Sequence, residues 1–435
     1  MSCNPHRKDE MSVHLYKKKI SSPKHCYTAC PKSNSESERQ GRFSWRGTLR
    51  RSLVGSSKPP EGISDYHPLL RDIRAMICGG MGVQLLPSLP YASFVFGDSL
   101  VDAGNNDYLF TLSKADSPPY GIDFAPSGGR PTGRFTNGRT ISDIIGQAMG
   151  ETSFPPPYLA PNTSSNILSS GINYASGSSG ILDETGSLFI GRVPLRQQIN
   201  YFEETRGFMV RMVGENAAAK FLKTAIFSVT SGSNDILNYL EPSIPFLGKE
   251  KVAPAVLQDM MVSNLTLHLK HLHQLGARKF IVVGIGPLGC IPYVRALMLV
   301  ENGKCSSVAD RLIQGYNMKL SRKINQLNQE MGPETIFVFA NSHQIVIEII
   351  KNYRQYGFEN VNDPCCGGSF PPFLCFRGPD AGSSSVLCKD RSKFVFWDAY
   401  HPTEATNIII AKRLLDGDAS AAYPVNVRRL YEYTS

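Results

Sequence analysis

The sequence has no long uninterrupted run of apolar residues. Its most apolar segment, Phe280 to Val294, is broken by three glycines and two prolines. A transmembrane helix needs about 20 predominantly apolar residues. We therefore expect a buried strand followed by a loop in this segment, and no transmembrane segment in the chain.

The first 20 residues also lack the apolar stretch of a secretory signal peptide, because they are polar and basic. The segment from Met76 to Leu86 is mildly apolar, but it contains three glycines and makes a poor signal. A tail rich in Ser and Arg weakly favours a plastid transit peptide, whereas its seven acidic residues argue against one. The start of the chain therefore leaves a plastid or intracellular location open.

Net positive charge is small outside the first 90 residues. Residues 1–90 account for +8 of the formal charge of +9, so residues 91–435 carry about +1 and indicate no nucleic-acid partner. Residues 1–90 also show almost no apolar periodicity, which predicts a disordered basic extension. The alternative is a tail that contacts RNA or an acidic membrane surface.

Two spacings typical of zinc sites are missing. HExxH does not occur, and the adjacent Cys365 and Cys366 lack the CxxC arrangement that places two thiolates on one metal. An even number of cysteines, four of them within 24 residues, favours disulfides in an oxidising compartment, with 15 possible pairings. Zinc remains the alternative reading. Two glycosylation sequons, at Asn162 and Asn264, also fit secretion. Six of the ten cysteines lie in residues 91–435, and the pairings counted above are among these six: Cys290, Cys305, Cys365, Cys366, Cys375 and Cys388.

Five short apolar runs alternate with segments of helical periodicity. This alternation predicts an α/β fold with three layers, in which helices cover both faces of a central parallel sheet of about five strands. We expect one domain over residues 91–420, followed by a C-terminal tail at 421–435. Ligands of such sheets bind beyond the carboxyl ends of the strands. The predicted strands are 93–96, 171–175, 225–230, 279–284 and 335–340, and the clearest helices are 252–275, 308–331 and 403–415.

Ser99 follows the first predicted strand. Gly97 permits a sharp turn, after which Ser99 would lie at or near the start of a helix. The free N–H groups and the dipole of a helix N-terminus favour developing negative charge. This position suits a nucleophilic hydroxyl, and a helix-capping serine is the alternative.

Two further strand ends carry candidate donors for an oxyanion. The second strand leads into the Gly-rich segment 176–180, whose backbone N–H groups are unobstructed, although a plain tight turn has the same composition. The third leads into segment 231–235, where Asn234 can direct its amide at an oxyanion or cap the next helix.

Asp398 and His401 lie three residues apart, after the apolar segment Phe394–Trp397. A catalytic histidine needs a carboxylate on its second ring nitrogen, and one loop can deliver both groups. The alternative is an isolated surface loop. Taken together, the strand-end motifs supply a nucleophile, oxyanion donors, a base and an orienting acid.

Several segments resemble the ordered sequence blocks of plant GDSL esterase/lipases, within the SGNH hydrolase superfamily. They are FVFGDSLVDAGNN, GINYASGSSG, GSNDIL and FVFWDAYHPTEATN, and PYGIDF, RFTNGR and GIGPLGCIP also look like family features. The resemblance extends from about residue 92 to 415. It implies a flavodoxin-like fold, no metal or organic cofactor, and secretion.

The resemblance also implies roles for particular residues. Ser99 would be the nucleophile and first oxyanion donor, with Gly177 and Asn234 as the other donors. His401 would be the base and Asp398 its partner. Ser178 stands where the family usually has glycine, which could narrow the oxyanion loop.

The expected activity is hydrolysis of carboxylic esters, either acyl lipids or acetylated glycans, by a monomer. An acyltransferase with the same residues and a non-catalytic glycan- or lipid-binding module remain the alternatives. The GIGPLG segment imitates a dinucleotide-binding fingerprint, but its proline falls where a helix should open with free N–H groups. We therefore predict no nucleotide cofactor.

Overall fold

The computed structural model describes residues 92–163, 167–241, 251–367, 375 and 387–433. All of them belong to the unit Leu85–Ser435. The predicted disordered extension at residues 1–90 lies outside the described residues. Among the described residues, the search for a helix long and apolar enough to cross a membrane finds none.

The five predicted strands form one sheet in which every neighbouring pair among them is parallel. The strand order is β2-β1-β3-β4-β5-β8, with β8 (Ala422–Tyr423) added at one edge. The expected α/β class with a central parallel sheet is confirmed. The five strands are β1 (Ser93–Gly97), β2 (Gly171–Asn173), β3 (Ile226–Thr230), β4 (Lys279–Val283) and β5 (Ile336–Ala340).

A row of four phenylalanines crosses the middle of the sheet. Phe94, Phe227, Phe280 and Phe337 occupy matching register positions on β1, β3, β4 and β5. Each is fully buried, and neighbouring rings lie 5.1, 5.8 and 4.3 Å apart. Side chains of adjacent strands at one register face the same side of a sheet. The aromatic row therefore joins four strands into one core.

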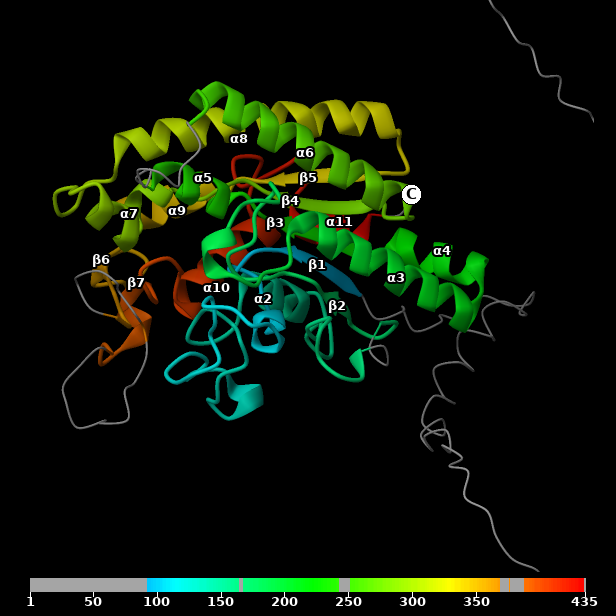
Figure 1. Ribbon diagram of the computed structural model, residues 1–435, viewed down its shortest axis with the longest axis horizontal. Coiled ribbons are helices and arrows are strands. Elements are labelled where there is room, and N and C mark those ends of the chain that lie inside the picture. Colours follow the sequence, from blue (N-terminus) through cyan, green and yellow to red (C-terminus); the bar gives the residue numbers. More distant parts are fainter. Residues whose placement is uncertain (1–91, 164–166, 242–250, 368–374, 376–386, 434–435) are drawn as a thin grey trace, which may run out of the picture. The chain divides into compact units, whose positions relative to one another are not determined.

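Helices cover both faces of the sheet (Figure 1). One layer contains α3 (Leu195–Val213), α4 (Glu215–Thr224), α5 (Ser233–Leu240), α6 (Pro254–Gln274) and α8 (Ser307–Met331). The other contains α2 (Ile141–Ala148), α9 (Ser342–Lys351) and α10 (Glu404–Asp416). The helices expected at 252–275, 308–331 and 403–415 thus correspond to α6, α8 and α10.

The remaining elements are short. Helix α7 (Pro292–Leu297) contacts β6 (Asn360–Pro364), which pairs in parallel with β7 (Phe394–Phe396) as a second, two-stranded sheet. The 3-10 turns are η2 (Asn105–Tyr108), η3 (Ala125–Ser127), η5 (Ser187–Phe189), η6 (Leu288–Cys290) and η7 (Arg391–Lys393).

The C-terminal segment is not a tail. Residues Ala422–Tyr423 form β8, which pairs antiparallel with β5, and Val427–Glu432 form α11. Val427, Leu430 and Tyr431 are buried. The predicted domain boundary at residue 420 is therefore too early, because the apolar residues that anchor this segment span less than two helical turns and give a weak periodic signal.

Helix α11 also helps to enclose a buried carboxyl group. Glu151 accepts a hydrogen bond from the Ser93 hydroxyl, which in turn contacts the Tyr431 hydroxyl at 3.1 Å. Burial raises the pKa of Glu151 to about 8, although the hydrogen bonds from Ser93 and Tyr431 act in the opposite direction. The folded protein therefore retains this proton at pH values where an unfolded chain has lost it.

We expect Glu151→Gln to protect the fold at alkaline pH. The pKa of Glu151 is raised on folding, so the free energy of unfolding of the wild type falls as pH rises from about 4.5 toward 8. The decrease is about 1.4 kcal/mol for each pH unit in this range. The amide cannot ionise and escapes this loss. Chemical denaturation at pH 5 and pH 8.5 should show a smaller decrease for the variant, with exposed Glu334→Gln as control. Equal decreases in all three proteins would contradict the assignment.

Candidate functional site

Ser99 lies just beyond the carboxyl end of β1, as predicted. At Gly97 the φ angle is +146°, and an added Cβ would lie 2.0 Å from the carbonyl oxygen of Thr230, so glycine is required there. The expectation that Ser99 begins a helix is wrong. Residues 98–101 form a turn, which is closed by a hydrogen bond from the Asp102 N–H to the Asp98 carbonyl at 3.1 Å. The chain does not continue from this turn as an α-helix. Instead, the Asp102 side chain accepts hydrogen bonds from the N–H groups of Gly104 and Asn105, and the chain bends again.

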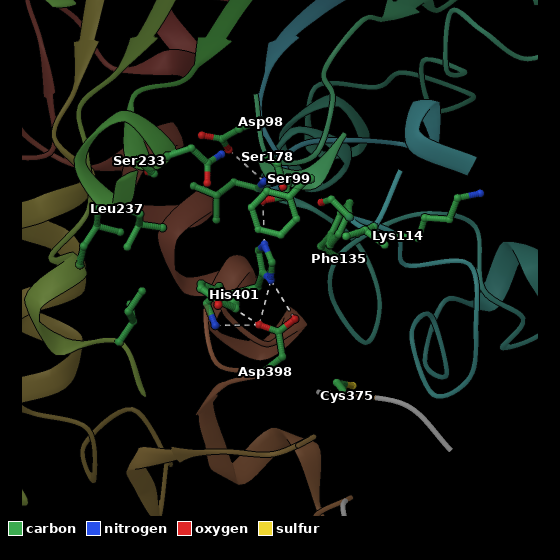
Figure 2. Close-up of a pocket in the computed structure, with 18 of the residues that line it drawn as sticks. Asp98, Ser99, Lys114, Phe135, Ser178, Ser233, Leu237, Cys375, Asp398 and His401 are labelled. Atoms are coloured by element: carbon green, nitrogen blue, oxygen red, sulfur yellow. Dashed lines mark hydrogen bonds and ion pairs between the residues drawn. The ribbon is translucent and has the colours of Figure 1, made fainter. Parts of the chain in front are cut away.

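His401 lies between Ser99 and Asp398 (Figure 2). Its Nε2 is 2.7 Å from Ser99 Oγ, and its Nδ1 is 2.8 Å from both carboxylate oxygens of Asp398. The loop that carries the pair runs from β7 to α10, where the Thr403 hydroxyl caps the helix. The fold thus brings Ser99, Asp398 and His401 into one hydrogen-bonded array, although Ser99 and His401 are 302 positions apart in the sequence.

The Asp398 carboxylate is fixed by several donors. Oδ1 accepts the backbone N–H groups of Tyr400 and His401, each at 2.8 Å, and Oδ2 accepts the Tyr120 hydroxyl at 2.8 Å. Burial by itself would raise the pKa of Asp398, but the charge of His401 and these hydrogen bonds hold the pKa below its ordinary value. The group is therefore an ionised carboxylate at neutral pH and stabilises a proton on His401 Nδ1.

Tyr120 and Phe135 were not identified as site residues from the sequence. Tyr120 contacts Asp398, and the Phe135 ring lies 5.2 Å from the His401 ring. The segments PYGIDF and RFTNGR, which contain them, were noted as family features without a role. Those segments were the available signal, but the partners lie more than 260 residues away in the chain.

Gly177 does not offer a free N–H group. Its N–H donates to Asp102 Oδ2 at 2.9 Å. A Cβ at this position would lie 2.7 Å from the Phe135 ring, which explains the glycine by packing alone. Gly177 is also absent from the residues that line the pocket in front of Ser99, whereas Ser178 is among them. The prediction of Gly177 as an oxyanion donor is therefore not supported.

The N–H groups of Ser99 and Ser178 are better placed. Both residues line the pocket, and within the described ranges neither N–H has a hydrogen-bond acceptor. Ser178 adopts φ +64°, the left-handed region that favours glycine. A glycine, which the family usually has here, adopts this conformation without strain, and Ser178 adopts it as well.

Asn234 lies in the first turn of α5 and lines the same pocket. One hydrogen of its amide goes to the Ser179 carbonyl at 2.8 Å, which leaves the second available. The neighbouring Asp235 accepts the N–H groups of Ile181 and Leu182 at 2.9 and 3.0 Å. Asp235 thereby attaches the Gly-rich loop to α5 and fixes Asn234 relative to Ser178.

Asp102, Asn105 and Asn106 shape the turn after Ser99 through their side-chain hydrogen bonds. Asp102 Oδ1 accepts the N–H groups of Gly104 and Asn105 at 2.7 and 2.8 Å. The amides of Asn105 and Asn106 donate to carbonyls of the β2 region, including that of Gly177 at 3.0 Å. This buried network connects the turn that carries Ser99 to the Gly-rich loop.

Asp98, next to Ser99, is a buried acid without a full set of hydrogen-bond partners. Oδ1 accepts the Leu100 N–H at 3.1 Å, whereas buried Oδ2 has no partner in the described part of the chain. Burial raises the pKa of Asp98 to about 7, against the opposing effects of the Leu100 N–H and the His401 charge. At neutral pH the Asp98 carboxyl is therefore partly protonated beside the nucleophile.

The six cysteines of residues 91–435 form three disulfides, which excludes them as zinc ligands. The pairs are Cys290–Cys305, Cys365–Cys388 and Cys366–Cys375. The backbone N–H groups of Cys365 and Cys366 donate to the carbonyls of Phe396 and Trp397 at 3.0 and 2.6 Å. The disulfide-linked segment thus supports the strand that leads into Asp398.

The pocket in front of Ser99, called the Ser99 pocket below, has a volume of about 210 Å³. Its walls combine charged groups, such as Asp398 and Lys114, with apolar ones, such as Leu237 and Phe135 (Figure 2). A serine hydroxyl bonded to a carboxylate-oriented histidine, beyond the end of a parallel strand, defines a serine hydrolase.

Comparison with known proteins identifies the family. The model of the GDSL-like lipase/acylhydrolase family matches residues 94–414, and the chain belongs to that family. It is 62% identical over 343 residues to a GDSL esterase/lipase of Arabidopsis thaliana, covering 78% of this chain and 93% of the relative. A second such relative from that plant is 50% identical over 346 residues, covering 78% of this chain and 90% of the relative. The protein is thus a plant-type ester hydrolase of the GDSL family.

Proposed function

We propose that Ser99, His401 and Asp398 hydrolyse carboxylic esters through an acyl-enzyme intermediate. The observation that carries this proposal is the continuous array from Ser99 Oγ through His401 to Asp398, with distances of 2.7 and 2.8 Å. His401 Nε2 accepts the hydroxyl proton as Ser99 Oγ attacks the ester carbonyl, and Asp398 stabilises the imidazolium that forms.

The two half-reactions use the same histidine. After attack, His401 returns the proton to the departing alcohol, which leaves an acyl group on Ser99. A water molecule then loses a proton to His401 and attacks the acyl carbonyl, which releases the acid and restores Ser99. We propose that the N–H groups of Ser99 and Ser178 and the free amide hydrogen of Asn234 stabilise the two oxyanions, with Ser178 in place of Gly177.

We expect Asn234→Ala to lower kcat by about 10²- to 10³-fold, with a smaller change in KM. The amide acts on the charge that develops in the transition state, and loss of one such donor typically costs about 3 kcal/mol of barrier. Steady-state kinetics on p-nitrophenyl butyrate measures both constants. A rise in KM at unchanged kcat would instead mean that Asn234 binds the ground-state ester.

We favour acyl lipids over acetylated glycans as substrates. Five exposed apolar side chains form a rim beside the Ser99 pocket: Tyr108, Phe110, Leu112, Leu188 and Ile190. Phe110 is 85% exposed. The two rim segments pair through the Leu112 N–H and the Phe189 carbonyl at 3.1 Å, and both of these residues line the pocket. Exposed apolar side chains on two paired segments that border an ester-cleaving site suit acyl chains rather than sugar hydroxyls.

Replacing rim residues should lower the activity on aggregated substrates more than the activity on soluble ones. We expect the double variant Phe110→Gln, Leu188→Gln to lose activity severalfold on an emulsified medium-chain ester, because it makes fewer apolar contacts with the lipid. The exposed Leu267 on α6 provides the matched control Leu267→Gln. Activity on soluble p-nitrophenyl acetate is the reference for each protein. An equal loss in rim and control variants would remove the support for lipid substrates.

A labelling experiment tests the proposed mechanism directly. A fluorophosphonate should modify the wild type at Ser99, as located by peptide mass spectrometry, and block turnover of p-nitrophenyl esters. Modification elsewhere with full inhibition would contradict Ser99 as nucleophile. Adding glycerol during turnover tests the acyltransferase alternative, which the family relation does not favour, because a transferase would form the glycerol ester in preference to the acid.

We infer that the enzyme works in an oxidising compartment such as the extracellular space. The three disulfides support this, since such bonds persist where thiols are not kept reduced. We also propose a monomer, since the hydrogen-bonded array of Ser99, His401 and Asp398 is complete within one chain and needs no second copy. Size-exclusion chromatography with light scattering measures the oligomeric state.

A further inference from the structure

A second cavity adjoins the Ser99 pocket and differs from it in chemistry. It has a volume of about 90 Å³ and shares five wall residues with the pocket, Leu100, Ser233, Leu288, Ile291 and Tyr400. We call it the apolar annex. The described residues that line it include no Asp, Glu, Lys, Arg or His, whereas four such side chains, Asp98, Lys114, Asp398 and His401, line the Ser99 pocket.

The annex lies beneath the carboxyl edge of the sheet. Its walls come from the loop after β4, around Ile285 and Gly286, and from Val346 on α9, Phe396 on β7 and Ile410 on α10. Ile285, Phe396 and Ile410 are each at most 3% exposed. A space of this lining favours hydrocarbon, because burial of apolar surface is favourable and an uncompensated polar group is not.

We propose that the apolar annex binds the acyl chain of the ester, so that the enzyme selects substrates by the length of a short-to-medium acyl group. This inference rests on the proposed function of Ser99. The pocket alone, at about 210 Å³, is smaller than most ligand sites, which occupy about 300–1,000 Å³; pocket and annex together reach that range.

The order of the reaction assigns the annex to the acyl group rather than to the alcohol. The alcohol must leave after the first half-reaction, while the acyl chain stays attached to Ser99 until water attacks. A space walled by buried residues suits the part that stays. The alcohol can depart along the open side of the pocket, where Lys114 and Leu112 lie.

The Ser231 hydroxyl, which lines the annex, is unfavourable for binding a plain hydrocarbon chain. Ser231 Oγ is buried and has no hydrogen-bond partner in the described part of the chain. An acyl chain that displaces water from the annex leaves this hydroxyl unsatisfied, which is costly. Ser231→Ala should therefore raise the preference for alkyl chains that fill the annex, relative to acetate.

Gly286 permits the opposite change. Its φ angle lies outside the left-handed region, and an added Cβ would meet nothing nearer than Ser342 Oγ at 3.9 Å, another annex residue. Larger side chains at this position therefore extend into the annex without backbone strain. Gly207 on α3 offers a matched control, because its added Cβ would meet only Arg211 Nη1, at 3.5 Å.

The test measures kcat/KM on p-nitrophenyl esters from acetate to dodecanoate. For the wild type we expect a maximum at the chain length that fills the annex. In Gly286→Leu the ratio of that maximum to the acetate value should fall on the order of tenfold or more, with a smaller fall in Gly286→Ala and none in Gly207→Leu. Equal effects of Gly286→Leu on all chain lengths, or a flat wild-type profile, would overturn the proposal.

A structure of the wild type inhibited by a p-nitrophenyl octylphosphonate gives a second test that needs no variant. The octyl chain should lie in the annex, between Ile285 and Val346. A chain directed to the rim instead would refute the annex as acyl site while leaving Ser99 as nucleophile intact. If the wild type cleaves none of the esters, or the phosphonate fails to attach to Ser99, the proposed function itself fails.

Discussion

Ser99→Ala should reduce kcat/KM on p-nitrophenyl butyrate by at least 10³- to 10⁴-fold, to the background of a protein that binds the ester without a nucleophile. Ser99 Oγ is the only atom of that side chain in the array with His401, at 2.7 Å, and alanine removes it with little change in volume. The oxyanion donors remain, so a small residual rate above that of water is expected. The change acts on covalent chemistry rather than on binding.

The measurement needs a protein of unchanged fold. Ser99 lies in a turn and is only half-buried, so alanine should leave the thermal transition close to that of the wild type. Ser321→Ala, a serine of α8 on the covering layer, is the matched control and should retain activity. Ester cleavage by Ser99→Ala at a substantial fraction of the wild-type rate would eliminate Ser99 as nucleophile, and fluorophosphonate labelling would then locate the true one.

Asp398→Asn should lower kcat on the order of 10³- to 10⁴-fold with little effect on substrate binding. The Asp398 carboxylate accepts a hydrogen bond from His401 Nδ1–H, which keeps the proton on Nδ1 and leaves Nε2 free to accept from Ser99. An amide in this place presents N–H to the ring and favours the opposite tautomer, in which Nε2 carries the proton and cannot act as a base. The substitution preserves shape, so geometry alone does not explain a large loss.

Tyr120→Phe provides the graded comparison for Asp398→Asn. It removes one 2.8 Å hydrogen bond to Asp398 Oδ2 but leaves the charge and the two backbone donors. A loss of about tenfold is expected, in line with one hydrogen bond to a charged group. If Asp398→Asn proved no worse than Tyr120→Phe, the carboxylate would not be the group that sets the tautomer of His401.

The positions of the strands and of the main site residues could be predicted from the sequence because their signals are local. A buried parallel strand appears as a short apolar run, and Gly97 marks the sharp bend that follows β1. The three-residue spacing of Asp398 and His401 is itself enough to let one loop bring them together. The helix expected at Ser99 was wrong because Asp102 bonds the N–H groups of Gly104 and Asn105 and diverts the chain.

Other features depend on partners far away in the chain. Gly177 was predicted as an oxyanion donor, but its N–H donates a hydrogen bond to Asp102, which lies 75 residues earlier in the chain. Tyr120 likewise contacts Asp398 across 278 residues. The pairing of the six cysteines could not be chosen among 15 possibilities without coordinates. The packing of residues 421–433 against β5 likewise depends on where the sheet edge lies.

By itself the sequence determined the alternation of strands and helices, the strand ends that carry chemistry, and the ester-hydrolase family. Tertiary structure alone decided that the Gly177 N–H is bonded to Asp102, which tyrosine holds the carboxylate, and that an uncharged annex adjoins the Ser99 pocket. The physical reason is the range of the interactions. Propensity and turn chemistry act over a few residues, whereas a hydrogen-bond partner or a cavity wall is fixed only when distant segments pack together.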